Sequence, residues 1–175
     1  MIREAKLGDE QSIHDLIVEL AVYEKEPDAV IASVADIKAN LFGSNPVAHA
    51  HVAEVDGQVV GVAIWFLNYS TWLGKAGLYL EDLYVKPEFR GHGFGKGFMK
   101  TLAKLCVDRG YERFQWWVLD WNEPSINFYK SLGAVPMDEW TVFRLSGPEL
   151  INFAKDYFLI RSISKISRCG SFYYG

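Results

Sequence analysis

The sequence predicts a single α/β domain in which helices flank a mixed β-sheet. Three observations support this prediction: β-rich runs, helical runs with apolar residues three and four positions apart, and turn signals between them. A chain of 175 residues is long enough for one domain with a hydrophobic core. Half of the residues are apolar and 23% are charged, which is typical of globular proteins and not of disordered ones.

The first elements predicted are one strand and two helices. Residues 2–5 form a short strand, and apolar residues at helical spacing after Asp9 predict the first helix. Ser33, followed three positions later by Asp36, predicts a capping box at the start of a second helix. That helix is expected to end at Gly43, because glycine readily terminates helices.

An antiparallel hairpin is predicted next. Residues 51–55 and 58–69 are rich in β-formers and flank Asp56 and Gly57, a pair that favours tight two-residue turns. A further strand follows over residues 78–85.

Helices and strands alternate in the rest of the chain. We expect a helix at 93–109, a strand at 113–119, a helix at 124–132, a final strand at 141–145 and a helix at 148–157. The crossover around the first of these helices favours parallel neighbours, so the sheet should be mixed. Periodicity is lost after residue 157, and residues 158–175 are interpreted as a C-terminal tail of unknown role.

Composition excludes several classes of protein. With a net charge of −4, the chain lacks the positive electrostatic field of a nucleic-acid-binding protein. No apolar run approaches the length of a membrane span and the N-terminus lacks a secretory signal, so we expect a cytoplasmic protein without membrane contact. Cys106 and Cys169 form no CxxC pair, and His49 and His51 have no third ligand at useful spacing, so no metal site is predicted.

A glycine-rich turn separates the predicted strand 78–85 from the helix that follows. The turn consists of Arg90, Gly91, His92, Gly93, Phe94, Gly95 and Lys96. Glycines let backbone N–H groups converge, and the helix N-terminus adds partial positive charge, so this segment can hold a pyrophosphate. The residue spacing of this turn matches neither a P-loop nor a dinucleotide-binding fingerprint. A tight turn without a ligand stays as the alternative.

Two carboxylates and one tyrosine are candidates for proton transfer. Glu81 and Asp82 are adjacent within a strand, so one of them should face the interior or a cleft, where it could bind a cationic amine or accept its proton. Tyr129 lies on the helix that follows Asn122, a predicted N-cap. Its phenol, with a pKa of about 10, could protonate a thiolate whose pKa is about 8.5. For the two carboxylates, the alternative is ordinary charge on an edge strand. For Tyr129, the alternative is packing in the core.

Together these motifs resemble the GNAT superfamily of N-acetyltransferases, whose Arg/Gln-x-x-Gly-x-Gly/Ala signature is matched from Arg90 to Gly95. Residues 79–82 and 121–130 are similar to the diamine (spermidine/spermine) N1-acetyltransferase family, including its thialysine branch. The resemblance covers about residues 2–155. It implies a twisted, mostly antiparallel sheet that is splayed between its fourth and fifth strands, acetyl-CoA as acetyl donor, and a homodimer.

The resemblance also implies roles for individual residues. Tyr129 would be the general acid and Glu81 the general base, acting through water. The residues expected to border acetyl-CoA are Leu83, Tyr84, Val85, Arg90, Gly91, His92, Gly93, Phe94, Gly95, Lys96, Asn122, Glu123, Pro124, Ser125 and Tyr129. The residues expected to line the amine channel are Tyr23, Glu24, Trp72, Glu81, Asp82, Gln115, Trp116, Trp117 and Glu139.

One departure from the family pattern bears on the amine acceptor. Polyamine-acetylating members have Tyr-Asp-Pro-Trp before the Glu-Asp strand, whereas this chain has Ser70 and Thr71 between Tyr69 and Trp72. Because a carboxylate is missing there, we expect a small diamine or lysine-like amine rather than a long polycation. Acetylation of a peptide, and acyl-CoA binding without catalysis, stay as alternatives.

Overall fold

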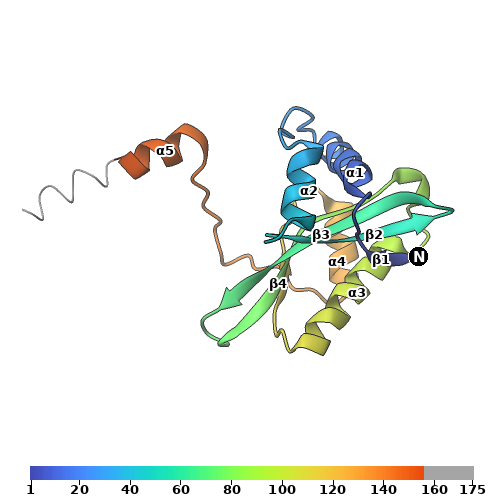
Figure 1. The fold of residues 1–175 in the computed structure, drawn as a ribbon. Coiled ribbons are helices and arrows are strands. Elements are labelled where there is room, and N and C mark those ends of the chain that lie inside the picture. Colours follow the sequence, from blue (N-terminus) through green and yellow to red (C-terminus); the bar gives the residue numbers. More distant parts are fainter. Residues whose placement is uncertain (156–175) are drawn as a thin grey trace, which may run out of the picture. The chain divides into compact units, whose positions relative to one another are not determined.

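The structure, a computed structural model, describes residues 1–155 (Figure 1). The expected tail 158–175 lies outside the described residues. The chain divides into two units, residues 1–123 and the part from residue 124 onward. The first unit carries a five-stranded sheet in the order β1-β2-β3-β4-β5.

Most helices and strands occur in the predicted order, and their bounds lie close to the predicted ones. The first unit contains β1 (Ile2–Glu4), α1 (Glu10–Tyr23), α2 (Val34–Phe42), β2 (His49–Val55), β3 (Gln58–Ser70), β4 (Lys75–Val85), the 3-10 turn η1 (Pro87–Phe89), α3 (Phe94–Arg109) and β5 (Phe114–Trp116). Beyond it come α4 (Glu123–Ser131) and α5 (Gly147–Lys155). Neighbouring strands are antiparallel except for β4 and β5, which are parallel, so the prediction of a mixed sheet is confirmed.

Short-range sequence signals are confirmed where local chemistry determines the backbone. The Ser33 hydroxyl accepts a hydrogen bond from the Asp36 N–H, and the Asp36 carboxylate accepts one from the Ser33 N–H, which completes the capping box. Asp56 and Gly57 have φ angles of 49° and 79°, as the tight turn between β2 and β3 requires.

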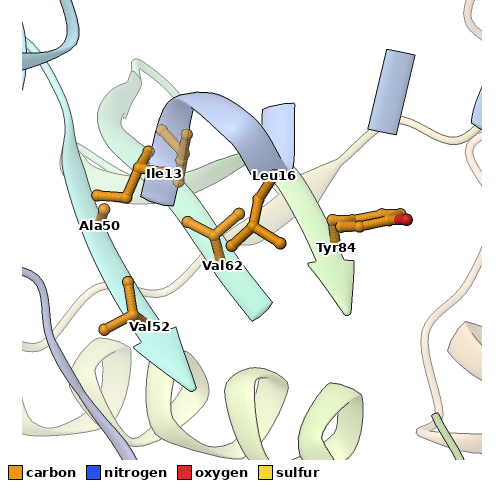
Figure 2. Packing of buried hydrophobic residues seen from close by; sticks show 7 residues of the cluster. Ile13, Leu16, Ala50, Val52, Val62 and Tyr84 are labelled. Carbon is orange, nitrogen blue, oxygen red and sulfur yellow. The ribbon is translucent and has the colours of Figure 1, made fainter. Parts of the chain in front are cut away.

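Helix α1 covers one face of the sheet. Its Ile13 and Leu16 are almost completely buried and belong to one cluster with Val52 of β2, Val62 of β3 and Tyr84 of β4 (Figure 2). Burial of these side chains is the main force that holds α1 on the sheet, at roughly 1.5–3 kcal/mol for each large apolar side chain.

Helix α3 packs on the sheet through close backbone approaches. A Cβ atom added to Gly61 of β3 would lie 3.3 Å from the Phe98 ring, and one added to Gly97 would lie 2.6 Å from the Ile2 side chain. Since side chains alternate along a strand, Gly61 and its neighbour Val62 face opposite sides. Helix α3 therefore lies on the face opposite α1.

Strands β4 and β5 pair over only three residues. Leu78–Leu80 face Phe114–Trp116, and β4 then continues to Val85 without a β5 partner. The pairing of β4 with β3 shifts by one residue at the same point, because Ile64 faces Asp82 while Trp65 faces Leu80. Glu81 is the extra residue of this β-bulge. The predicted splay between the fourth and fifth strands is confirmed.

Two predictions about the later elements need correction. Residues 141–145 are not a strand, and β5 is limited to Phe114–Trp116 instead of 113–119. Both segments have β-rich sequences, but a strand forms only where a neighbour satisfies its backbone hydrogen bonds. Within residues 1–155, no strand pairs with 141–145. None of the helices in this range is both long and apolar enough to cross a bilayer.

Candidate active site

The site forms where β4 separates from β5. Beyond Leu80, the edge of β4 from Glu81 to Val85 has no strand beside it in the described part of the chain. Backbone N–H groups on such an edge are available to hydrogen-bond a ligand. Gln115 and Trp116 end β5 at this point, and the Trp117 ring meets the Tyr79 ring edge to face at 5.7 Å.

The bulge gives the two adjacent carboxylates different environments. Glu81 is exposed, whereas Asp82 is half-buried. Burial is the main cause that raises the pKa of Asp82 to about 7, and the negative charges of Glu81 and Glu24 raise it further. A carboxyl group with this pKa can exchange a proton near neutral pH. The expectation that one member of the pair faces the interior is therefore met by Asp82.

The end of α1 adds a third carboxylate, Glu24, to this group. Tyr23 is the last residue of α1 and Glu24 is its C-cap, and both are half-buried. Burial also raises the pKa of Glu24. Since the two charges that act on Asp82 are both negative, a bound cation would be stabilised beside these carboxylates.

The glycine turn has the conformation expected of an anion cradle. Gly91 and Gly93 have φ angles of 79° and 84°, and Gly93 is the N-cap of α3. No other group lies within 4 Å of the position that a Cβ atom would take at either glycine, so the surface of the turn is open. The N–H groups of the first turn of α3 begin there, which suits a phosphate.

Asn122 contacts the end of α1. It is buried, and its Oδ1 accepts a hydrogen bond from the Tyr23 hydroxyl at 3.1 Å. The Trp121 ring lies 6.1 Å from the Tyr23 ring, and the Lys25 ammonium lies 4.5 Å from the Trp121 ring. The turn that precedes α4 is thus connected to the end of α1.

Trp72 lies away from the site at Asp82. It lies in the turn between β3 and β4, where 89% of its side chain is exposed. Along β4, Asp82 lies roughly 20 Å from that turn, at about 3.3 Å per residue. Within one chain, Trp72 therefore does not line a channel at Asp82.

The other predicted residues belong to the second unit or to its boundary. Glu123 begins α4, which carries Pro124, Ser125 and Tyr129, and the Tyr129 ring lies 5.2 Å from that of Phe128. Glu139 lies between α4 and α5, outside any helix or strand.

Some contacts were missed by reasoning from the sequence. Lys86, just after β4, forms an ion pair with Glu19 of α1 at 3.1 Å. The Arg90 guanidinium lies over the Tyr23 and Tyr84 rings. No spacing pattern could have predicted these contacts, since α1 and β4 are separated by two strands and a helix in the sequence.

The chain is similar in sequence to known acetyltransferases. Residues 11–134 match the acetyltransferase (GNAT) family. The chain is 42% identical over 165 residues to thialysine N-epsilon-acetyltransferase of Sus scrofa, which covers 88% of this chain and 96% of the relative. It is 29% identical over 194 residues to L-ornithine N5-acetyltransferase of Arabidopsis thaliana, covering 85% of each.

A solved structure of similar fold supports the same assignment. An integron cassette protein from the mobile metagenome of V. cholerae superposes with a TM-score of 0.76 at 26% identity, and the match covers 89% of this chain and 97% of that one. The family match over residues 11–134 includes the splayed β4 edge and the glycine turn at the start of α3. The chain belongs to the GNAT family of acetyltransferases.

Proposed function

We propose that the protein transfers an acetyl group from acetyl-CoA to a primary amine of a small diamine or a lysine-like substrate, of the thialysine or polyamine type. The transfer is direct, within a ternary complex of enzyme, donor and amine. The observation that carries this proposal is the half-buried Asp82, held with Glu81 and Glu24 at the place where β4 leaves β5. A cationic amine satisfies these carboxylates better than a neutral or anionic acceptor.

The donor site of this proposal combines two backbone features. The open edge of β4, from Leu83 to Val85, would bind the pantetheine arm, and the turn from Gly91 to Lys96 would bind the pyrophosphate. Asn122, Glu123, Pro124 and Ser125 would border the same molecule. The protein supplies N–H donors at both places.

The reaction requires two protons to leave the amine nitrogen. A primary ammonium has a pKa of about 10, so the amine must first lose a proton before its lone pair can attack the thioester. We assign this proton to Glu81 through a water molecule, since its exposed side chain is accessible to water. Tyr129 donates a proton to the departing CoA thiolate. The second amine proton leaves as the amide forms and restores the Tyr129 phenol through water.

Asp82 is the second candidate for the general base. Its pKa of about 7 lies close to the operating pH, where a base is most effective. If Asp82 is the base, Asp82→Asn abolishes the acidic limb of the pH profile of kcat/KM, whereas Glu81→Gln retains it. The opposite pattern supports Glu81.

The remaining assignments follow the same family pattern. We propose a homodimer in the cytoplasm, with residues 1–157 as the acetyltransferase domain. Tyr23, Gln115, Trp116, Trp117 and Glu139 are proposed as lining of the amine channel, together with the acidic residues above. Trp72 could contribute only from the partner subunit, because it lies far from Asp82 in its own chain.

A thiol-release assay with acetyl-CoA tests the proposal. The panel should include small diamines, thialysine, ornithine, spermine and short peptides with a free lysine or N-terminus. We expect turnover with small diamines or thialysine and less with spermine, because a carboxylate is missing at Ser70. A peptide that is acetylated better than every small amine would support the alternative of a peptide acetyltransferase. Tight CoA binding without any acceptor would support a non-catalytic binding module.

A further inference from the structure

The side chain of Arg90 is bound by residues outside the glycine turn that it begins. Its Nε donates a hydrogen bond of 2.9 Å to the carbonyl oxygen of Val85. Val85 is the last residue of β4. The signature motif places Arg90 next to the pyrophosphate cradle, so its charge was expected to contact the donor. In the structure the guanidinium is instead engaged by β4 and α1.

Two tyrosine rings complete the surroundings of this guanidinium. Its central carbon lies 5.0 Å from the centre of the Tyr23 ring and 5.3 Å from that of the Tyr84 ring. Both distances are within the reach of a cation–π interaction. Tyr84 is buried in the cluster beneath α1, and Tyr23 is the last residue of that helix. Arg90 thus connects the end of β4 to the end of α1.

The connection extends through Tyr23 to the turn before α4. The Tyr23 hydroxyl donates to Oδ1 of buried Asn122 at 3.1 Å, and the Asn122 N–H donates to the Leu119 carbonyl at 2.8 Å. All of these groups lie within residues 1–123. Arg90 and Asn122, which flank the proposed donor site, are therefore connected through one side chain of α1.

Glu24 lies next to these contacts in the sequence. Glu24 follows Tyr23 directly, and its N–H donates to the Leu20 carbonyl at 2.8 Å. Its negative charge helps to raise the pKa of Asp82, so a cation bound near Asp82 would also be stabilised by Glu24. Because Tyr23 and Glu24 are adjacent, we expect a shift of Tyr23 to displace Glu24 as well.

We propose that Arg90 is a positioning residue for the amine acceptor: it holds Tyr23, and through it Glu24, in place, and it is not a ligand of the donor pyrophosphate. This inference rests on the proposed function, because it concerns the acceptor side of the same site. The backbone of Gly91 to Lys96 and the N-terminus of α3 hold the anion without the guanidinium. The Nε atom already donates to the Val85 carbonyl, and the guanidinium lies over the two rings.

Arg90→Lys tests the proposal, because lysine keeps the charge and loses the planar group that lies over the rings. We expect the KM for the amine to rise about three- to thirtyfold, the range that corresponds to loss of a cation–π contact and one hydrogen bond. The kcat and the dissociation constant of acetyl-CoA, measured by calorimetry, should change little. Arg109→Lys, at the exposed end of α3, is the matched control and should alter none of these values.

Tyr23→Leu provides a second, independent variant. It should raise the amine KM as Arg90→Lys does. The effect of the double variant should be smaller than the sum of the two single effects, because both variants remove the contact between Arg90 and Tyr23. The same non-additivity should appear in unfolding free energies from urea titration. That measurement needs no substrate, so it still tests the contact if no amine in the panel is acetylated and the proposed function fails.

A different pattern would overturn the inference. If Arg90→Lys weakens acetyl-CoA binding while the amine KM stays unchanged, Arg90 is a donor ligand. Additive effects of Arg90→Lys and Tyr23→Leu, on both the amine KM and unfolding, would show that the two residues act separately.

Discussion

Asp82 is the residue whose ionisation differs most from that of an ordinary surface carboxylate. Its pKa in the folded protein is about 7, whereas an unfolded aspartate ionises near 3.9. The folded state therefore binds the proton more tightly than the unfolded state. The resulting contribution to stability is fully present below about pH 4 and is lost as the pH rises through 7. At neutral and alkaline pH, the ionised Asp82 destabilises the fold.

The variant Asp82→Asn should therefore be more stable than the original chain at pH 8, by at least about 1 kcal/mol, a value discounted for solvent screening of a half-buried group. The difference should shrink toward pH 5, as the carboxyl group in the original chain becomes protonated. Thermal unfolding at several pH values measures it. Glu81→Gln, which changes the exposed neighbour, is the control and should alter the unfolding temperature much less.

Tyr129 is the second residue on which the proposed chemistry depends. Tyr129→Phe removes only the hydroxyl, so kcat should fall about 100-fold or more, as expected for loss of a general acid. The affinity for acetyl-CoA should be nearly unchanged. Tyr69→Phe, at an exposed position of β3, serves as the matched control. Unchanged turnover in Tyr129→Phe would refute the role of Tyr129 as acid.

Among the elements, α3 has a left-handed glycine at each end, and only one of them adjoins the proposed donor site. Gly93, the N-cap, has a φ of 84°, and Gly110, the C-cap, has a φ of 68°. No other group lies within 4 Å of an added Cβ at either position, so a side chain there costs energy through backbone strain and not through a clash.

The variants Gly93→Ala and Gly110→Ala separate stability from donor binding. Each should destabilise the fold by about 1–2 kcal/mol, because alanine disfavours the left-handed conformation. Only Gly93→Ala should also weaken acetyl-CoA binding, by about tenfold or more, or ~1.4 kcal/mol. Chemical denaturation and calorimetry measure the two effects. Equal donor affinity in the two variants would argue against a pyrophosphate at this turn.

At the scale of the whole molecule, the proposed domain ends at residue 157 and the assembly is proposed to be a homodimer. A chain shortened to residues 1–157 should keep its unfolding temperature, its dimeric state and its activity on the preferred amine. Light scattering and the thiol-release assay compare it with the full chain. Loss of dimerisation or of turnover in the shortened chain would assign a role to residues 158–175.

The sequence by itself determined the features that depend on local chemistry. The capping box at Ser33, the tight turn at Asp56 and Gly57, the glycines that end α2 and α3, and the motif from Arg90 to Gly95 are all readable from neighbouring residues. Each is set by contacts within a few positions of the chain. For this reason the order of the elements from β1 to β5, apart from the short turn η1, was predictable.

Only the tertiary structure decided which residues meet across the chain. The bulge at Glu81, the burial of Asp82 and the stacking of Arg90 on Tyr23 join elements that lie far apart in sequence. The final strand was predicted wrongly for the same physical reason, since a β-rich segment becomes a strand only beside a partner. The sequence thus determined the proposed donor turn, and the packing of α1 on β4 decided how the proposed acceptor carboxylates are arranged.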